Sequence, residues 1–433
     1  MLTPLLCNVV SFWLVFLQNF PENIFVSAIY KSESLSYNNL TRFPARSEQD
    51  ADNQFRKRGI IMYSSEDLQW IWLCSVPGIG PVRRSLLLQC FGTVGQVFEA
   101  SRQDYLRERF SEKEAEALCT GKDPEKIRGQ AERWAEQGIT VLTPSSAVFP
   151  RSLLRADPPV FLLYAKGDIS LLQRKNVGIV GSRKCTNYGS AAARYLSGNL
   201  ARFGYGIVSG MAYGIDACAG RGALDAGGGT IAVLGCGADI CYPQGNRALY
   251  NKIAAKGLLL SEYPPGTRPL AGSFPMRNRI IAALSQAIVI VEAAERSGAL
   301  ITVTIAADSG IPVLVVPGPI FSETSRGTNL LIRDGAELVL RWEDIPIALG
   351  DMNPEAIREE EHAGNNSGKG PGPSFPDETA EQIWENISWE ARSTADIIRD
   401  CSLPPEKVLP VLTMLELQGY IETLPNKDII RLR

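Results

Sequence analysis

The sequence predicts an α/β protein with an extended Rossmann-like parallel sheet. A helical domain of the helix-hairpin-helix or SAM-like kind precedes this sheet, and a winged-helix domain follows it. The main observation is a series of short apolar runs, rich in Val, Ile and Leu, that alternate with helical stretches. Continuously apolar strands separated by helices are typical of a parallel sheet covered on both faces. The expected strands are residues 177–180, 206–209, 230–234, 258–261, 287–291 and 313–316. Glycine-rich and polar turns follow them, and in such sheets these turns gather at one edge, where ligands bind.

The totals describe an ordinary globular chain of 433 residues, with 45% hydrophobic residues and a net charge of −3. This length allows two or three domains. The expected parts are an atypical extension at 1–61, helices at 62–145, the Rossmann-like domain at 146–345, a flexible linker at 346–376 and the winged helix at 377–433. A mildly acidic chain has no global basic field, so any nucleic-acid site must be a local basic patch.

Cysteine and histidine usage exclude several kinds of site. The nine cysteines form no CxxC pair, which indicates reduced thiols in a cytoplasmic protein rather than a disulfide framework or a zinc site. The one histidine, His362, lies in a low-complexity segment, so a histidine-based triad, metal site or acid–base pair is excluded. We expect no metal, no cofactor and no catalytic residue.

Residues 1–61 do not match the rest of the chain. Their apolar stretch at 2–17 lacks a basic flank and is too short for a membrane span. A signal anchor is one interpretation. We favour a non-native upstream extension, with Met62 as the natural start and no stable membrane association.

The region from Tyr63 onward is helical in pattern. Ser65 is expected to cap a first helix. The glycine-flanked turn at 76–81, followed by Arg83 and Arg84, matches a helix-hairpin-helix, whose turn amides contact a DNA phosphate in some proteins and serve only packing in others. Residues 139–142 then suggest a first strand.

The stretch at 175–193 is the first candidate site. Its strand ends in the loop Gly181, Ser182, Arg183 and leads into a helix from Gly189. Such a turn presents backbone N–H groups and a positive helix end to an anion, and Arg183 adds a planar cation suited to phosphate. The alternative is that the glycine serves only the turn.

Further polar loops follow the other strands. They contain Ser209, Gly210, Tyr213, Gly214 and Asp216 after the second strand, Ser261 and Glu262 after the fourth, then Phe274, Arg277, Asn278 and Arg279, and finally Ser297 and Gly298. Each has a structural alternative: Asp216 as a helix cap, one arginine of the pair Arg277 and Arg279 as a surface charge, and Glu262 and Glu292 as caps or ion-pair partners. Taken together, so many polar residues at one edge indicate an anion site.

These loops resemble the DNA-processing protein A family (DprA/Smf). The matching motifs, in order, are GSRKCTNYG at 181–189, SGMAYGID at 209–216, SEYPPGT at 261–267, FPMRNRII at 274–281 and RSGALIT at 296–302. The resemblance covers about residues 63–345 and extends to the C-terminal domain. It implies a dimeric protein that binds single-stranded DNA at this edge without cleaving it and loads RecA recombinase onto incoming DNA during natural transformation.

One position departs from the family pattern. Many members read GIDAAAHRGAL, whereas residues 214–224 read GIDACAGRGAL, with Gly220 in place of the common histidine. If that histidine shapes the DNA pocket, this chain has lost its contribution. The departure bears on DNA affinity and leaves the predicted fold unchanged.

The C-terminal part changes composition. An acidic run, Glu359 to Glu361, lies in Gly/Ser/Asn/Pro-rich sequence, which is typical of a flexible linker. Helical patterns at 383–387, 394–399 and 405–418, then a hairpin at 419–427, predict a winged helix. Its third helix carries Glu406, Lys407 and Glu416 and is not basic, so we expect protein contact or regulation rather than duplex reading.

The sequence thus favours non-sequence-specific binding of single-stranded DNA. The predicted DNA-binding residues are Gly181, Ser182, Arg183, Lys184, Ser209, Gly210, Phe274, Arg277, Asn278 and Arg279. The predicted supporting residues are Tyr213, Gly214, Asp216, Ser261, Glu262, Ser297 and Gly298. Amides of Ser182, Ser209 and Gly210 would join Arg183 at phosphates, Arg277 and Arg279 would extend the basic track, and Phe274 would stack on a base.

Two enzyme classes are the alternatives. A Rossmann-like nucleotide N-glycosidase would use Glu262 or Glu292 as its base, but a PGG-x-GT-type loop is absent from the sequence. A dinucleotide-dependent oxidoreductase would need G-x-G-x-x-G at the first turn, and Gly178 and Gly181 have the wrong spacing.

Overall fold

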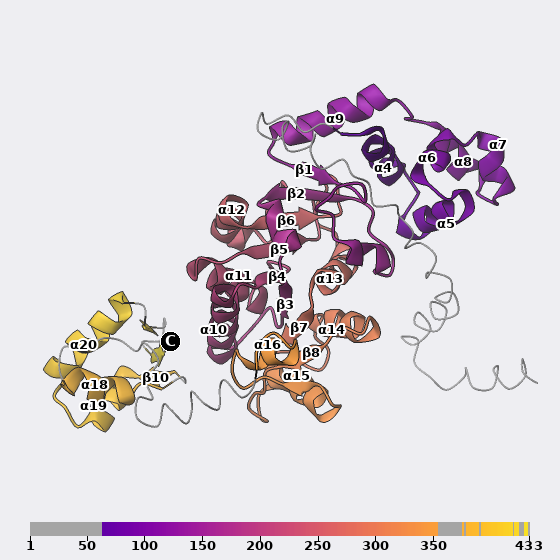
Figure 1. The fold of residues 1–433 in the computed structure, drawn as a ribbon. Coiled ribbons are helices and arrows are strands. Elements are labelled where there is room, and N and C mark those ends of the chain that lie inside the picture. The colour runs from indigo at the N-terminus through magenta and orange to yellow at the C-terminus, as the bar shows by residue number, and fades with distance from the viewer. Residues whose placement is uncertain are drawn as a thin grey trace, which may run out of the picture. The chain divides into compact units, whose positions relative to one another are not determined.

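A nine-stranded sheet forms the centre of the chain. The computed structural model describes residues 63–353, 375, 378–388, 391–418, 420–423 and 428–431. The expectations for residues 1–61, for nearly all of the linker after residue 353 and for the tip of the C-terminal hairpin lie outside these residues. Figure 1 shows helices on both faces of the sheet, as the sequence predicts.

The N-terminal region is helical. Its helices are α4 (Ser65–Ser75), α5 (Pro81–Phe91), α6 (Val94–Glu99), α7 (Arg102–Arg107), α8 (Glu112–Cys119) and α9 (Pro124–Glu136). The cap of α4 is Ser64, not Ser65: its hydroxyl accepts from Asp67 N, and the Asp67 carboxylate accepts from Ser64 N in return. This reciprocal pair satisfies N–H groups that a helix start leaves open.

The hairpin between α4 and α5 is present, and both of its arginines bind within the fold. Arg83 forms a two-bond ion pair with Glu114, with N···O distances of 2.6 and 2.7 Å. Arg84 donates to Cys74 O at 2.8 Å. These guanidinium contacts favour the packing interpretation of the hairpin over DNA contact.

The sheet is mostly parallel. Its strands are β1 (Thr140–Leu142), β2 (Leu163–Gly167), β3 (Asn176–Val180), β4 (Gly206–Ser209), β5 (Thr230–Leu234), β6 (Leu258–Ser261), β7 (Ala287–Ile290), β8 (Val313–Val315) and β9 (Glu337–Leu338), in the order β1-β2-β6-β5-β4-β3-β7-β8-β9. The predicted parallel core from β3 to β8 is confirmed. The sequence missed β2, which pairs antiparallel with β6, and β9. Strand β1 pairs antiparallel with β2, so the region expected at 62–145 shares its last strand with the sheet.

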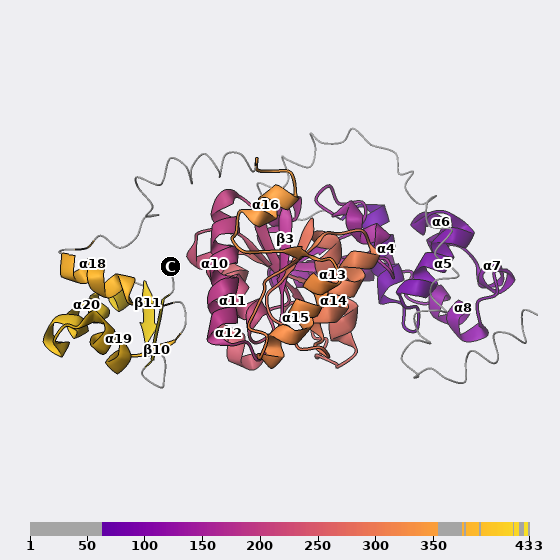
Figure 2. The ribbon, with the colours of Figure 1, turned by 90° about the horizontal axis from the view of Figure 1, so that it is seen from below.

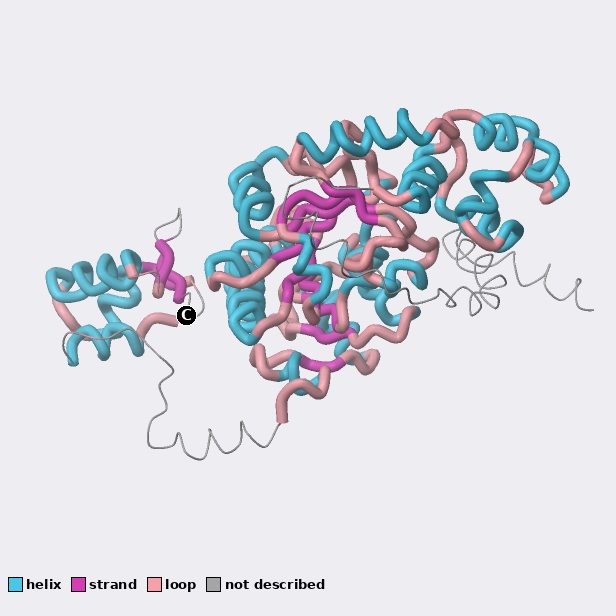
Figure 3. Tube along the Cα trace, turned by 45° about the horizontal axis from the view of Figure 1, so that its top comes forward, coloured by secondary structure: helices cyan, strands magenta, loops and turns pink. Residues whose placement is uncertain are grey.

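Helices cover each face of the sheet separately. The helices after β3 are α10 (Asn187–Phe203), α11 (Ile215–Asp225), α12 (Arg247–Lys256), α13 (Ser273–Leu284), α14 (Ala299–Asp308), α15 (Glu323–Arg333) and α16 (Asp344–Ala348). Short 3-10 turns lie at Arg151–Arg155, Ile169–Gln173 and Gln244–Asn246. Residues of α10 and α11 pack with Ile179 and Val289, whereas α13 and α14 pack with Val180 and Ile290, on the opposite face. Figure 2 shows β3 between these two helical layers, and the strands of the central part in Figure 3 form one twisted sheet.

The C-terminal part is a winged helix, as predicted. It contains α18 (Glu378–Glu385), α19 (Thr394–Cys401) and α20 (Pro405–Leu417), with a small sheet of β10 (Arg392–Ser393), β11 (Ile421–Thr423) and β12 (Asp428–Arg431) in the order β10-β12-β11. Helix α18 begins before the predicted residue 383, and its Ile383 and Trp384 join the small core.

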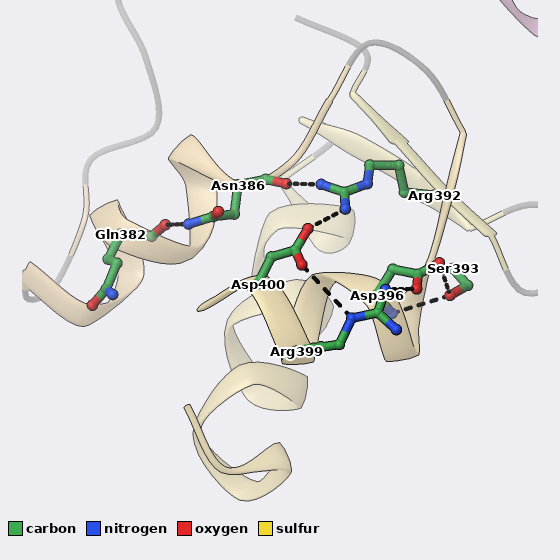
Figure 4. A network of polar contacts seen from close by, with 7 residues as sticks. All are labelled: Gln382, Asn386, Arg392, Ser393, Asp396, Arg399 and Asp400. Carbon is green, nitrogen blue, oxygen red and sulfur yellow. Dashed lines mark hydrogen bonds and ion pairs between the residues drawn. The ribbon is translucent and has the colours of Figure 1, made fainter. Parts of the chain in front are cut away.

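Polar contacts join the winged-helix elements (Figure 4). Arg392 pairs with Asp400 of α19 and donates to Asn386 O at 3.4 Å. Ser393 caps α19: its hydroxyl accepts from Asp396 N at 3.1 Å and donates to the Asp396 carboxylate at 2.7 Å. The first strand of the wing is thereby tied to both neighbouring helices.

Helix length and polarity also bear on the expectation about membranes. Among the residues that the structure describes, no helix is long and apolar enough to cross a bilayer.

Candidate nucleic-acid interface

The loops at the carboxyl ends of β3 to β8 lie along one edge of the sheet, because these strands are parallel. We call these loops the rim: residues 181–186, 210–214, 235–246, 262–272, 291–298 and 316–322. Every residue of the predicted site except Ser209, Asp216, Ser261 and those of α13 lies in the rim. The predicted site residues therefore gather at one edge of the sheet, and their contacts decide which side chains face outward.

The β3–α10 loop has a fixed backbone and outward side chains. Ser182 N donates to Glu292 O at 2.7 Å, and Ser182 O accepts from Ile215 N at 3.1 Å. A Cβ on Gly181 would lie 2.7 Å from Ile215 Cγ1, so only glycine fits there. Arg183 and Lys184 are exposed. The amide of Ser182 is thus engaged within the protein, and the charged side chains are the groups available to a ligand.

The N-terminus of α10 already holds an anion, and it belongs to the protein. The buried carboxylate of Glu292, at the end of β7, accepts from Thr186 N at 2.8 Å and from Thr186 Oγ1 at 2.5 Å. A Cβ on Gly189 would overlap this carboxylate, so the glycine makes room for it. Thr186 is the N-cap residue, and its hydroxyl accepts from Gly189 N at 3.1 Å. Glu292 supports this cap, so the expectation that this helix end offers its amides to a phosphate is corrected.

Replacing Glu292 by glutamine is expected to lower the free energy of unfolding by about 1–2 kcal/mol. The amide keeps one acceptor and loses the charge that favours a helix N-terminus. Urea unfolding measures this loss, and Glu295→Gln, at an exposed position nearby, is the matched control. A Glu292→Gln protein of unchanged stability would contradict the capping role.

In the β4–α11 loop, a carboxylate of the protein likewise occupies the backbone amides. The Asp216 carboxylate, in the first turn of α11, accepts from Gly210 N at 3.1 Å and from Ala212 N at 3.4 Å. Burial raises the pKa of Asp216, and the neighbouring Arg277 guanidinium opposes this rise. Ser209 is buried, and its hydroxyl donates to Ile179 O at 2.7 Å. The proposed contact of the Gly210 amide with phosphate does not fit this arrangement, since Asp216 occupies that amide.

Arg277 and Arg279 do not form an exposed basic track. Arg277 is 5% exposed and donates to Val233 O at 2.5 Å, and a Cβ on Gly210 would overlap its guanidinium. Arg279 is 2% exposed and binds both oxygens of Glu262, with N···O distances of 2.8 and 2.6 Å. Both arginines lie on α13. Both guanidinium groups are therefore buried below the rim surface, and Glu262 is the ion-pair partner of Arg279.

An exposed basic and aromatic group remains at the rim. The Arg183 guanidinium lies 5.6 Å from the centre of the Phe274 ring, and Phe274 stacks on Tyr242 with ring centres 5.3 Å apart. Phe274 is half-buried against Gly235, whereas Tyr242 is 39% exposed. The sequence prediction included Arg183 and Phe274 and omitted Tyr242. The position of Tyr242 in the loop after β5 could have identified it, because that loop lies at the same edge of the sheet as Arg183.

The other predicted supporting residues shape the loops. Tyr213 is exposed, and its ring lies against Gly245. Gly214 has a positive φ of 74°, which suits glycine. Ser261 is buried, and its hydroxyl donates to Cys236 O at 2.6 Å. Ser297 accepts from Ala299 N at 3.3 Å where α14 begins. Two further predicted residues are Asn278, half-buried on α13, and Gly298, exposed at the start of α14.

Gly220, the departure from the family pattern, lies away from the rim. A Cβ there would meet Leu249, Thr230 and Ile253 no closer than 3.8 Å. Thr230 begins β5, so this position faces the opposite end of that strand from the rim loops. The loss of a histidine here leaves the rim contacts in place.

Comparison with known proteins identifies the family. A model described as DNA recombination-mediator protein A matches residues 140–350, and one described as DprA winged helix domain matches residues 369–427. The putative DNA processing protein DprA of Mycobacterium tuberculosis is 35% identical over 82% of this chain and 91% of its own length. The chain belongs to the DNA-processing protein A (DprA/Smf) family.

Other DprA/Smf proteins agree with this assignment. Protein Smf of Synechocystis is 39% identical over 67% of this chain and 74% of its own length. The X-ray structure of DprA from Streptococcus pneumoniae superposes with a TM-score of 0.58 at 31% identity, covering 68% of this chain and 99% of that one. The fold of this DprA-family chain therefore occurs in a solved relative.

Proposed function

We propose that this DprA-family chain binds single-stranded DNA at the rim without sequence preference. The observation that carries the proposal is the group formed by the exposed Arg183, Lys184 and Tyr242 with the half-buried Phe274. Cations hold the phosphates, and aromatic rings accept any base, because every base has a stacking face. Such a site needs no base-edge hydrogen bonds and so has no sequence preference.

Three features favour a single strand over a duplex. Stacking on Tyr242 needs an unpaired base, which a duplex does not offer. The winged helix is the other candidate DNA contact, and its α20 carries two glutamates, Glu406 and Glu416, against one lysine, Lys407. Arg83 and Arg84 of the N-terminal hairpin already bind groups of the protein.

The partner proteins form the second part of the proposal. We propose that the chain acts as a homodimer that loads RecA recombinase onto the bound strand during DNA uptake and recombination. An edge is available for a second copy, since β9 ends the sheet in the described residues with Leu338 half-exposed and Leu340 largely exposed. Apolar side chains on an open edge strand favour pairing with another chain.

The glycosidase alternative loses its candidate bases. Glu292 binds Thr186, the N-cap residue of α10, and Glu262 pairs with Arg279, so each carboxylate has a structural partner. The group at the rim supports binding of a strand rather than acid–base chemistry on it.

Replacing Tyr242 by alanine is expected to weaken oligo-dT binding by about five- to hundredfold, since stacking on one base contributes about 1–3 kcal/mol. Fluorescence anisotropy measures the affinity for single-stranded and duplex DNA, and addition of RecA to the same mixture tests for a slower-tumbling ternary complex. Tyr242→Phe should bind as wild type does. Tyr195→Ala, at a tyrosine of similar exposure on α10, is the control. Equal affinity of wild type for single strands and duplex would rule out the proposal.

A further inference from the structure

The turn that ends the β8–α15 loop of the rim exposes two large apolar side chains. Ser322 N donates to Pro319 O at 3.0 Å, so residues 319–322 form a turn with Ile320 and Phe321 at its two central positions. Phe321 is 95% exposed, and Ile320 is 77% exposed. Gly, Pro, Asn, Asp and Ser are the usual residues of turns. A sequence that departs from such a local preference commonly does so at a functional site.

Hydrogen bonds on both sides of this turn join it to the start of α10, close to Arg183. Before the turn, Pro317 O accepts from the Tyr188 hydroxyl at 2.8 Å. After the turn, Thr324 Oγ1 donates to Glu292 Oε1 at 3.4 Å, and this is the carboxylate that lies at the N-terminus of α10. The turn therefore lies beside the loop that carries Arg183.

The backbone just before the turn is also held by α15. Gly318 N donates to Asn329 Oδ1 at 3.2 Å, and Asn329 Nδ2 donates to Gly318 O at 3.0 Å. A Cβ on Gly318 would overlap the Ser325 side chain, so this loop packs closely on the helix. Phe321 is thus presented to solvent from a fixed backbone, which lowers the entropy cost of binding a ligand there.

The strand order places Phe321 and Tyr242 on opposite sides of Arg183. The order in this part of the sheet is β5-β4-β3-β7-β8, and Tyr242 and Phe321 belong to the loops after β5 and after β8. The parallel register keeps the carboxyl ends of β3, β7 and β8 level. Two strand spacings separate β3 from β8 by about 10 Å, or about three nucleotides stacked at about 3.4 Å each.

The charges near Phe321 balance. The exposed Arg296 lies in the loop after β7, between the loops of Arg183 and Phe321. Arg326 pairs with Glu295 at 3.2 Å, and Glu323 is exposed at the start of α15. These two cations and two carboxylates together have no net charge. A contribution of Phe321 to DNA binding would therefore come from stacking on a base and not from attraction to phosphate.

We propose that Phe321 is a second stacking position for the strand bound at the rim. The DNA then runs across the ends of the β-strands, from Tyr242 past Arg183 to Phe321. This inference rests on the proposed function and adds to it the path of the strand and a length requirement, because only an oligonucleotide that reaches both aromatic positions gains both stacks. A phenyl ring accepts any base, so the second position adds no sequence preference.

A length series of oligo-dT tests the second position. Fluorescence anisotropy with strands of about 4 to about 16 nucleotides covers the usual range of single-strand site sizes. We expect Phe321→Ala to weaken binding of the longest strand by about five- to hundredfold, as the loss of one base stack does, and to leave binding of the shortest strand unchanged. The slope of log K against log salt should stay as in wild type, because no phosphate contact is lost.

Three further variants separate stacking from other effects. Phe321→Trp keeps an aromatic face and should bind the longest strand at least as tightly as wild type. Phe321→Leu keeps an apolar side chain without that face and should lose affinity as Phe321→Ala does. Phe203→Ala is the matched control, because this exposed phenylalanine ends α10, shortly before β4 begins, and so lies at the opposite edge of the sheet. It should bind every strand as wild type does.

Photocrosslinking of the full chain to oligo-dT that contains 5-iodouracil maps the path directly. Trypsin gives peptides 222–247 and 297–326, which contain Tyr242 and Phe321. We expect crosslinks in both peptides with the longest strand. Absence of any crosslink in peptide 297–326 would contradict the path.

The binding outcomes distinguish this inference from the proposed function. If Phe321→Ala binds every strand as wild type does while Tyr242→Ala binds more weakly, the second position is overturned and the proposed function stands. A Phe321→Ala protein that changes its oligomeric state and keeps its DNA affinity would make the turn a protein contact and likewise overturn the inference. If wild type binds no strand of the series, the proposed function fails and this inference with it.

Discussion

Arg183→Ala is expected to weaken binding of oligo-dT by about ten- to hundredfold. One charge-assisted hydrogen bond to a phosphate contributes about 1.5–3 kcal/mol, and each 1.4 kcal/mol changes the affinity about tenfold. Arg183 is exposed, and in the described residues its guanidinium lies over Phe274 rather than in an ion pair. Its loss also removes one counterion-releasing contact, so the slope of log K against log salt should fall by about 0.7.

The position of Arg183 supplies a matched control. Arg174, also exposed, lies just before β3, whereas Arg183 lies just after it. Arg174→Ala therefore makes the same charge change at the opposite edge of the sheet and should leave the affinity within twofold. Arg183→Lys should retain the salt slope and lose part of the affinity, because an ammonium lacks the planar fork of donors. If Arg183→Ala and Arg174→Ala bind equally, the DNA does not lie at the rim.

The parallel strands were predictable because of their composition. The runs that became β3 to β8 are short, nearly continuous and rich in Val, Ile and Leu, and such runs are typical of buried strands. Strand β2 was missed because residues 160–162 before it are also apolar and buried, so its start had no boundary. Strand β9 has two exposed residues, and pairing with β8 alone defines it.

The site was predictable as a set of loops and not as a set of contacts. The strand–loop–helix pattern at β3 predicted a phosphate at the start of α10, but the group found there is the carboxylate of Glu292, which lies 106 residues away in the sequence. Arg277 and Arg279 were assumed to be exposed because arginines usually are. Their burial depends on tertiary neighbours, Asp216 and Glu262, that no local pattern identifies.

Arg279→Met is expected to lower the free energy of unfolding by about 3–5 kcal/mol, because it leaves the carboxylate of Glu262 buried without its cation. The side chains of the pair are 2% and 11% exposed. Guanidinium denaturation measures the loss. The control is Arg326→Met, which removes the cation of the exposed pair with Glu295, with an N···O distance of 3.2 Å, and should cost less than about 1 kcal/mol.

A double-mutant cycle then distinguishes pairing from a DNA contact. Nε and Nη1 of Arg279 find no hydrogen-bond partner among the described residues, so the guanidinium itself carries a desolvation cost. Arg279→Met combined with Glu262→Gln removes both charges, and we expect this protein to recover most of the stability lost in Arg279→Met alone. It should also bind oligo-dT within a fewfold of wild type, because neither side chain reaches the rim surface. A stable Arg279→Met protein that no longer binds DNA would instead place this guanidinium on the strand and return it to the exposed track that the sequence first suggested.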